Sequence, residues 1–192
     1  MERDGFSAPF RVVDEITMSG YRRAFDALFA APGRAAHTPL QSRHLDAPVV
    51  HSLCTHPAIL EHVHAALGPS VVLWRSNFYR KQPGEGEIAW HRDRDHWKHL
   101  LEPMRNVTAW IAIDAATTES GCLEFRLDGE HAIPVELAPG ECVLFDQDAW
   151  HRSGPNRSTT RRLGLAVRFT LPDVRIAPGR AIGPTGTLRL DA

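Results

Sequence analysis

The segment WHRDRDHW, residues 90–97, places an imidazole and a carboxylate two positions apart, at His91 and Asp93. On a β-strand, residues i and i+2 point to the same face, so these two side chains can converge on one metal cation. Asp95 shares their parity but lies about 13 Å from His91 along a continuing strand, and His96 has the opposite parity. The pattern favours His91 and Asp93 as a ligand pair, with a solvated charged turn as the alternative interpretation.

A further histidine, His151, follows the strand-like segment ECVLFD and comes 58 residues after Asp93. A histidine at a strand end is a suitable third ligand, and a hydrogen-bonded histidine without a metal is the alternative. Two imidazoles and one carboxylate form the facial triad of non-haem Fe(II) oxygenases, which leaves coordination positions open. His91, Asp93 and His151 are therefore candidates for such a catalytic metal site.

An apolar strand, RLGLAVRFT at residues 162–170, begins eleven positions after this histidine. Its bulky residues share one face, and the opposite face carries Arg162 and Arg168. Gly164 and Ala166 lie between the two arginines and leave room for a bound molecule. A buried arginine needs an anion to satisfy its guanidinium donors. A solvated sheet face is the alternative, so the strand by itself leaves the role of these arginines open.

The elements that would position these residues change character near residue 70. Before it, apolar residues recur at helical spacing. Ser19 is expected to cap a first helix that ends at Pro32-Gly33, and Thr55 to cap a second, with a loop at 33–54 between them. After residue 70, short apolar segments follow one another without helices, which is typical of an antiparallel sandwich or barrel. These segments are residues 71–81, 107–116, 121–125, 141–146 and 162–170.

The predicted fold is mainly β with N-terminal helices: a double-stranded β-helix, or jelly roll, in a single domain. The length of 192 residues suits one domain. We expect residues 1–192 to divide into a helical N-terminal part at 1–69, a β core at 70–170 and a C-terminal tail at 171–192. The tail is rich in glycine and proline, which predicts a segment that lies over the surface.

Composition narrows the classes of partner. Lys and Arg together number 22 and Asp and Glu 23, a net charge of −1, so nucleic acid and anionic membranes are not expected partners. The three cysteines are far apart and form no CxxC pair, and no apolar run has the length of a membrane span. These features favour a cytoplasmic protein, and they do not distinguish a monomer from a simple homo-oligomer.

The combined pattern of HxD, a later histidine and an arginine, all on predicted strands, resembles the phytanoyl-CoA dioxygenase-like family of Fe(II)/2-oxoglutarate-dependent oxygenases, which includes ectoine hydroxylase-like members. The resemblance covers about residues 70–170. Further segments that resemble family motifs are Lys81-Gln82-Pro83-Gly84, Trp90 to Trp97, Asn106 to Asp114, Thr117 to Leu123 and His151 to Asn156. Gly129-Glu130-His131 departs from the family pattern, which has serine before the histidine.

The resemblance implies a 2-oxoglutarate-dependent non-haem iron dioxygenase that uses Fe(II), 2-oxoglutarate as cosubstrate and O₂. His91, Asp93 and His151 would hold the iron, and Arg162 would pair with the distal carboxylate of 2-oxoglutarate. The resemblance also assigns Ser153, Lys81 and Trp110 to the cosubstrate pocket.

The substrate is expected to be a small polar metabolite, an amino-acid-like compound or a natural-product intermediate. Related halogenases replace the carboxylate ligand with a small residue, so Asp93 argues for hydroxylation or another C–H oxidation. The alternative is a cupin-like jelly-roll metal-binding protein or isomerase that does not use 2-oxoglutarate and does not need Arg162. Candidate residues for the substrate end are Arg75, Asn77, Tyr79, His96, Trp97 and Arg168.

Overall fold

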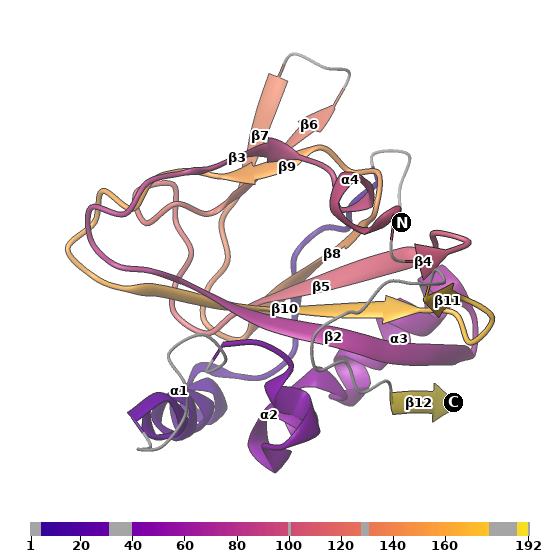
Figure 1. Cartoon of the computed structure of the whole chain (residues 1–192). Coiled ribbons are helices and arrows are strands. Elements are labelled where there is room, and N and C mark those ends of the chain that lie inside the picture. The colour runs from indigo at the N-terminus through magenta and orange to yellow at the C-terminus, as the bar shows by residue number, and fades with distance from the viewer. Residues whose placement is uncertain (1–4, 31–39, 100, 128–130, 177–187, 192) are drawn as a thin grey trace.

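Two antiparallel sheets face each other in the computed structural model, and helices cover the outer side of the larger sheet (Figure 1). This is the predicted jelly roll with N-terminal helices. The structure describes residues 5–30, 40–99, 101–127, 131–176 and 188–191.

The larger sheet is centred on a strand whose nine residues are all buried, β10 (Arg162–Thr170). It pairs on one side with β5 (Asn106–Ala112) and on the other with β2 (Ser70–Lys81). The sheet's spatial order is β1 (Phe10–Arg11), β8 (Glu141–Asp146), β5, β10, β2 and β12 (Leu188–Asp191). The predicted segments at 71–81 and 162–170 therefore form adjacent strands, although 81 residues separate the ends that pair, Lys81 and Arg162.

The alternation of side chains along β10 gives this sheet two different faces. Leu163, Leu165 and Phe169 point to the helices and join a core that includes Phe25 of the first helix. Ala166, on the other face, belongs to a second core between the two sheets. The helical side of the sheet is thus packed mainly with apolar residues, and Arg162 and Arg168 of β10 lie on the side that faces the smaller sheet.

The smaller sheet has four strands in the order β3 (Ile88–His91), β9 (His151–Ser153), β6 (Leu123–Leu127) and β7 (His131–Val135). Gly121, just before β6, has φ of +79°, and a Cβ there would lie 2.2 Å from the carbonyl oxygen of Gly154. Only glycine allows this close approach. It holds the loop after β9 against the turn that enters β6.

The helices begin at other residues than predicted. α1 (Glu15–Ala30) starts before Ser19, because Asp14 Oδ1 accepts a hydrogen bond from Thr17 N at 2.7 Å and acts as the cap. Ser19 lies inside the helix, where its hydroxyl accepts from Arg23. Pro32-Gly33, the predicted end, lies outside the described residues.

The predicted loop at 33–54 contains a helix, α2 (Pro48–Cys54), preceded by a short 3₁₀ turn, η1 (Arg43–Leu45). At seven residues α2 is too short for a clear sequence periodicity, and it forms by burying Val50, Leu53 and Cys54. Thr55 terminates it. The cap of α3 (Pro57–Leu67) is His56, whose Nδ1 accepts from Ala58 N.

Both ends of the chain add strands that the sequence did not suggest. β1 lies in the predicted helical part and pairs with β8, whereas β12 lies in the predicted tail and pairs with β2. A small separate ladder joins β4 (Leu101–Glu102) to β11 (Arg175–Ile176). The segment predicted as the tail, 171–192, therefore contains two short paired strands, β11 and β12. Among the described helices, none has the length and apolarity to cross a membrane.

Candidate metal centre and pocket

The two predicted histidine ligands face each other across the β3–β9 pair. His91 is directly opposite His151 in the strand register, and their ring centroids are 4.2 Å apart. The Nδ1 of His91 lies 2.8 Å from the carbonyl oxygen of Ala89, and the Nδ1 of His151 lies 3.0 Å from that of Ala149. Because a carbonyl only accepts, each Nδ1 carries the hydrogen, and each Nε2 keeps a lone pair for a metal ion.

Asp93 reaches the same point from the beginning of a helix. β3 ends at His91, Arg92 is extended with φ of −118° and ψ of 141°, and Asp93 is the first residue of α4 (Asp93–Trp97). The ligand atoms of His91, Asp93 and His151 all lie within 4.8 Å of one another. The strand parity expected for 90–97 therefore applies only as far as Asp93. Asp95 lies within α4 and forms an ion pair with Arg92.

Hydrogen bonds and charges fix the carboxylate of Asp93. Thr108 Oγ1 donates to its Oδ2 at 2.7 Å, and Arg168 Nε approaches the same oxygen at 3.3 Å. Burial acts to raise the pKa of Asp93, but Arg168, His151 and the Thr108 hydrogen bond outweigh it and lower the pKa to about 2. The carboxylate is thus ionised at neutral pH and held in one orientation.

The electrostatics of the histidines suit a metal site. The pKa of His151 is lowered to about 4, mainly because the ring is buried and also because His91 is adjacent. The imidazole of His151 is therefore neutral and able to donate a lone pair. Two imidazoles and one carboxylate match the donor set of a facial-triad Fe(II) site. The residues present therefore fit this metal.

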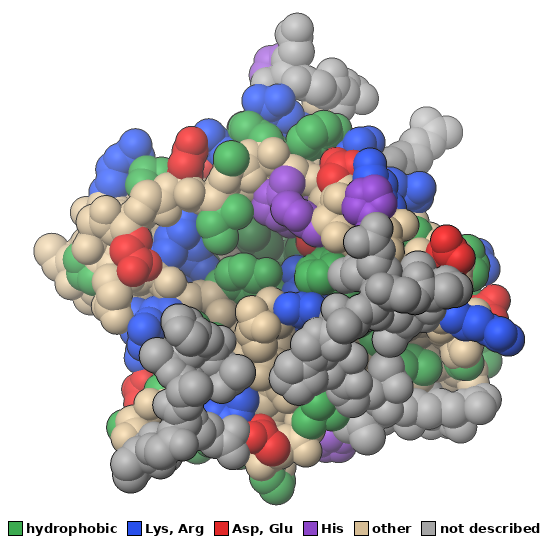
Figure 2. All heavy atoms as spheres, viewed as in Figure 1, with side chains coloured by type: hydrophobic (Ala, Val, Ile, Leu, Met, Phe, Trp, Pro, Cys, Tyr) green, Lys and Arg blue, Asp and Glu red, His purple; other side chains and the backbone are tan. Residues whose placement is uncertain are grey.

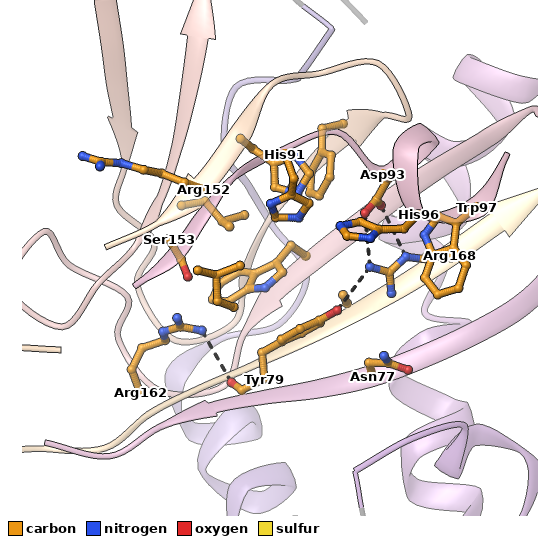
Figure 3. Close-up of a pocket in the computed structure, with 16 residues that line it drawn as sticks. Asn77, Tyr79, His91, Asp93, His96, Trp97, Arg152, Ser153, Arg162 and Arg168 are labelled. Atoms are coloured by element: carbon orange, nitrogen blue, oxygen red, sulfur yellow. Dashed lines mark hydrogen bonds and ion pairs between the residues drawn. The ribbon is translucent and has the colours of Figure 1, made fainter. Parts of the chain in front are cut away.

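Arg162 lies further along the same pocket, on the face of β10 that points to the smaller sheet (Figure 3). Its side chain is 1% exposed, and its Nε and Nη2 have no hydrogen-bond partner among the described residues. One weak bond, from Nη1 to Tyr79 O at 3.5 Å, is its only protein hydrogen bond in the part of the chain that the structure describes. The hydroxyl of Ser153, also in the pocket wall, is likewise buried without a partner. Burial lowers the pKa of Arg162 to about 10, so it stays cationic at neutral pH.

Trp110 shapes the Arg162 end of the pocket. The Arg162 guanidinium lies 5.3 Å from the centre of the Trp110 ring. A Cβ on Gly164 would lie 2.0 Å from an atom of the same ring, so the indole occupies the space above the glycine. The expectation that Gly164 leaves room for a bound molecule was wrong: Trp110 fills that room, and only Ala166 of the two small residues lines the pocket.

Lys81 has a different environment from the pocket that we expected. Its ammonium group donates to the carbonyl oxygens of Ser153, at 2.9 Å, and Gly154. It is not among the described residues that line the pocket. The pKa of Lys81 is lowered to about 8, mainly because the group is buried and also because the charge of Arg162 is close. In this position Lys81 fixes the loop that follows β9, and so holds Ser153 in place.

The pocket is a cavity of about 400 Å³ between the two sheets. Its mouth is the hollow in Figure 2, where histidine side chains lie at the rim. It brings together most of the predicted substrate residues, but Arg75 is not among the described residues that line it. The predicted residues that line it are Asn77, Tyr79, His91, Asp93, His96, Trp97, Trp110, His151, Ser153, Arg162 and Arg168.

Sequence reasoning missed several other residues of the pocket lining. Phe145 lies in the predicted strand 141–146 and Leu123 in the predicted strand 121–125, so the parity of those strands could have identified them. Ile88 and Arg152 lie in β3 and β9, which are too short to show a period. These four residues complete the lining together with Ala166.

Several known proteins are similar to this chain in sequence or in structure. Methylphosphonate hydroxylase of Gimesia maris is 28% identical over 141 residues, which are 62% of this chain and 53% of that protein. The structure of a non-heme monooxygenase, the ThoJ–Ni complex, superposes with a TM-score of 0.82 at 25% identity and covers 98% of this chain and 81% of its own. CytC3 with Fe(II) and alpha-ketoglutarate gives a TM-score of 0.77 at 26% identity and covers 93% and 77%.

The chain spans about half the length of the curated relatives that it matches. The sequence profile described as phytanoyl-CoA dioxygenase (PhyH) matches residues 1–164, which include the helical N-terminal part as well as His91, Asp93, His151 and Arg162. The chain therefore belongs to the phytanoyl-CoA dioxygenase family.

Proposed function

We propose that this protein is an Fe(II)/2-oxoglutarate-dependent oxygenase, with His91, Asp93 and His151 as the iron ligands. The observation that carries the proposal is the pairing of this triad with a buried arginine that has two unpartnered donors in the same cavity. The triad alone is enough to hold a metal ion. The unpartnered donors of Arg162 in the same cavity also need an anion. 2-Oxoglutarate, with a carboxylate at each end, meets both needs.

Arg162 and Ser153 bind the distal carboxylate of the cosubstrate. The guanidinium offers Nε and Nη2, which is the fork geometry that suits a carboxylate, and the Ser153 hydroxyl offers another donor. Trp110 limits the movement of the guanidinium from one side. The Lys81 bond to the Ser153 carbonyl holds the backbone of this end in place, so Lys81 acts as a positioning residue.

When bound, Fe(II) supplies the reaction with O₂ that converts 2-oxoglutarate to succinate and CO₂ and oxidises a C–H bond of the substrate. The chain orients the reactants and excludes water. Phe145 and Leu123 are among the apolar residues of the wall. The carboxylate of Asp93 occupies the position that must be small to admit a halide, which supports hydroxylation, or another C–H oxidation, over halogenation.

The substrate is a small polar molecule: a metabolite, an amino-acid-like compound or a natural-product intermediate. Asn77, Tyr79, His96 and Arg168 give the cavity a polar end, and its volume of about 400 Å³ lies in the range of small-molecule pockets. The relative named methylphosphonate hydroxylase supports the inclusion of small phosphonates among candidate substrates. The near-neutral net charge gives no support to a nucleic acid or membrane partner.

The test is succinate release and O₂ uptake in the presence of Fe(II), 2-oxoglutarate and a panel of small metabolites. We expect succinate to form and to increase when a substrate is present. The variant Asp93→Ala should form none, and Asp95→Ala, in the same helix but outside the pocket lining, should behave as the wild type. If succinate never forms, or if Arg162→Ala keeps full activity, a metal-binding jelly roll that does not use 2-oxoglutarate replaces the proposal.

A further inference from the structure

The pocket has a second buried arginine, Arg168, at the end away from Arg162. The two residues lie on the same face of β10, six positions apart, which is roughly 20 Å along a strand. Figure 3 shows them at opposite ends, with Tyr79 between them. A five-carbon cosubstrate held between the metal triad and Arg162 does not reach the outer side of Arg168, so this end is left for another molecule.

Arg168 keeps a donor that no protein group uses. Its side chain is 4% exposed and lines the cavity, and its Nη1 has no hydrogen-bond partner among the described residues. Its Nε and Nη2 are directed to Asp93, and Nη2 also donates to the hydroxyl oxygen of Tyr79 at 3.3 Å. A buried guanidinium nitrogen without an acceptor is costly, and an anionic oxygen would satisfy it.

Neighbouring side chains supply further donors. Trp97 lines the same end, its ring lies 5.4 Å from the Arg168 guanidinium, and its buried Nε1 has no partner in the described part of the chain. The Tyr79 oxygen accepts from Arg168, which leaves its own hydrogen free to be donated. Asn77 Oδ1 accepts from Arg75 Nε at 3.3 Å, which leaves the Asn77 amide NH₂ as a donor. Donors are concentrated here, as at an anion site.

The net charge of the site with Fe(II) and 2-oxoglutarate bound also favours an anionic ligand at Arg168. The positive charges of Fe(II), Arg162 and Arg168 exceed the negative charges of Asp93 and the dianionic cosubstrate by about one unit. Without a metal, Arg168 is the cation that balances Asp93. Once a metal shares that carboxylate, the charge of Arg168 is less fully balanced, and a negatively charged substrate restores the balance.

We propose that the substrate carries an oxyanion group, a carboxylate or phosphonate, that binds Arg168 Nη1 together with the indole N–H of Trp97 and the hydroxyl of Tyr79. This proposal rests on the proposed function, since it assumes that the cosubstrate occupies the Arg162 end. Arg168 thereby selects the class of substrate and holds it beside the metal triad.

The test measures binding without turnover, in protein loaded with redox-inert Zn(II) and saturated with 2-oxoglutarate so that Arg162 is occupied. The probes are butanoate against butanamide, and ethylphosphonate against its neutral dimethyl ester, followed by ligand-observed NMR titration. We expect at least one anion to bind about tenfold or more tightly than its neutral counterpart. The two pairs distinguish a carboxylate site from a phosphonate site.

Variants assign the effect to one arginine. Arg168→Gln should remove the preference for the anion, whereas Arg75→Gln should keep it, because Arg75 contacts Trp97 at 4.7 Å but does not line the cavity. Equal binding of anion and neutral probe by the wild type, or a preference that survives Arg168→Gln, overturns the proposal; the wild-type comparison holds even if the variant folds poorly. If 2-oxoglutarate does not bind the zinc-loaded protein, the proposed function fails first, and the substrate proposal fails with it.

Discussion

Arg162 and Arg168 share a strand, a face and a cavity, yet their surroundings differ. Arg168 is paired with a carboxylate of the protein, at 3.3 Å from Asp93. Arg162 has no ion pair among the described residues and has two donors without partners. Removing one partner of a buried ion pair lowers the free energy of unfolding, because the other charge stays buried alone. A buried cation that has no partner already lowers that free energy, and a bound anion would satisfy its donors. The comparison separates a cation that the protein itself balances, with one donor left over, from a cation that only a ligand can balance.

The largest expected effect comes from the removal of Asp93. Asp93→Ala leaves the buried Arg168 without its counter-charge, so the free energy of unfolding should fall by about 3–5 kcal/mol. Metal binding should be lost at the same time. Denaturant titration and metal analysis of the purified protein check both outcomes. An unchanged denaturation midpoint would mean that Arg168 does not depend on Asp93.

A change at Gly164 disturbs only the Arg162 end. Gly164→Ala places a Cβ against the Trp110 ring, which must move, at a cost of about 3 kcal/mol in the free energy of unfolding. The affinity for 2-oxoglutarate should fall as well, because Trp110 packs against the Arg162 guanidinium. The reverse change two positions along, Ala166→Gly, is the control and should cost only about 1 kcal/mol. Equal effects of the two changes would contradict the role given to Trp110.

Arg162 and Arg168 should respond in opposite directions when each is replaced by methionine in the protein without metal or cosubstrate. Arg162→Met removes a buried cation with unmade hydrogen bonds, so the free energy of unfolding should rise by about 2 kcal/mol. Arg168→Met leaves the buried carboxylate of Asp93 without its counter-charge and should lower the free energy of unfolding. Thermal and denaturant unfolding at low salt give the signs. The same sign for both variants would remove the distinction between the two ends.

The convergence of His91, Asp93 and His151, and the place of Arg162 in the same cavity, were predictable because strand parity applies to these residues. His91 and His151 are on strands, and the extended Arg92 preserves the parity that brings Asp93 to the same side. The pairing of Asp93 with Arg168 was not predictable, because 75 residues separate them and only the packing of α4 over the larger sheet brings them together. Lys81 was misjudged for a similar reason: its parity is correct, but its partners are carbonyls on a loop.

The smallest expected effect concerns Lys81, behind the Arg162 end. The pKa of Lys81 is lowered to about 8 in the folded protein, against 10.5 for an ordinary lysine. Between these values the unfolded chain binds more protons than the folded one, so this group should make the free energy of unfolding rise as the pH rises from 8 to about 10. Denaturation of wild type and Lys81→Met at several pH values measures the difference. A wild type that loses more stability than the variant over this range would contradict the assigned environment.

The central proposal is that Arg162 binds the far carboxylate of 2-oxoglutarate beside the metal triad. It is tested most directly by anaerobic titration of 2-oxoglutarate into the Fe(II)-loaded protein, followed by the weak visible charge-transfer absorption of the chelated metal. The account predicts that the band appears in the wild type and that Arg162→Met needs about 100-fold more 2-oxoglutarate to reach it, as expected for the loss of two charge-assisted hydrogen bonds. A wild type without the band, or a variant that titrates as the wild type does, would contradict it.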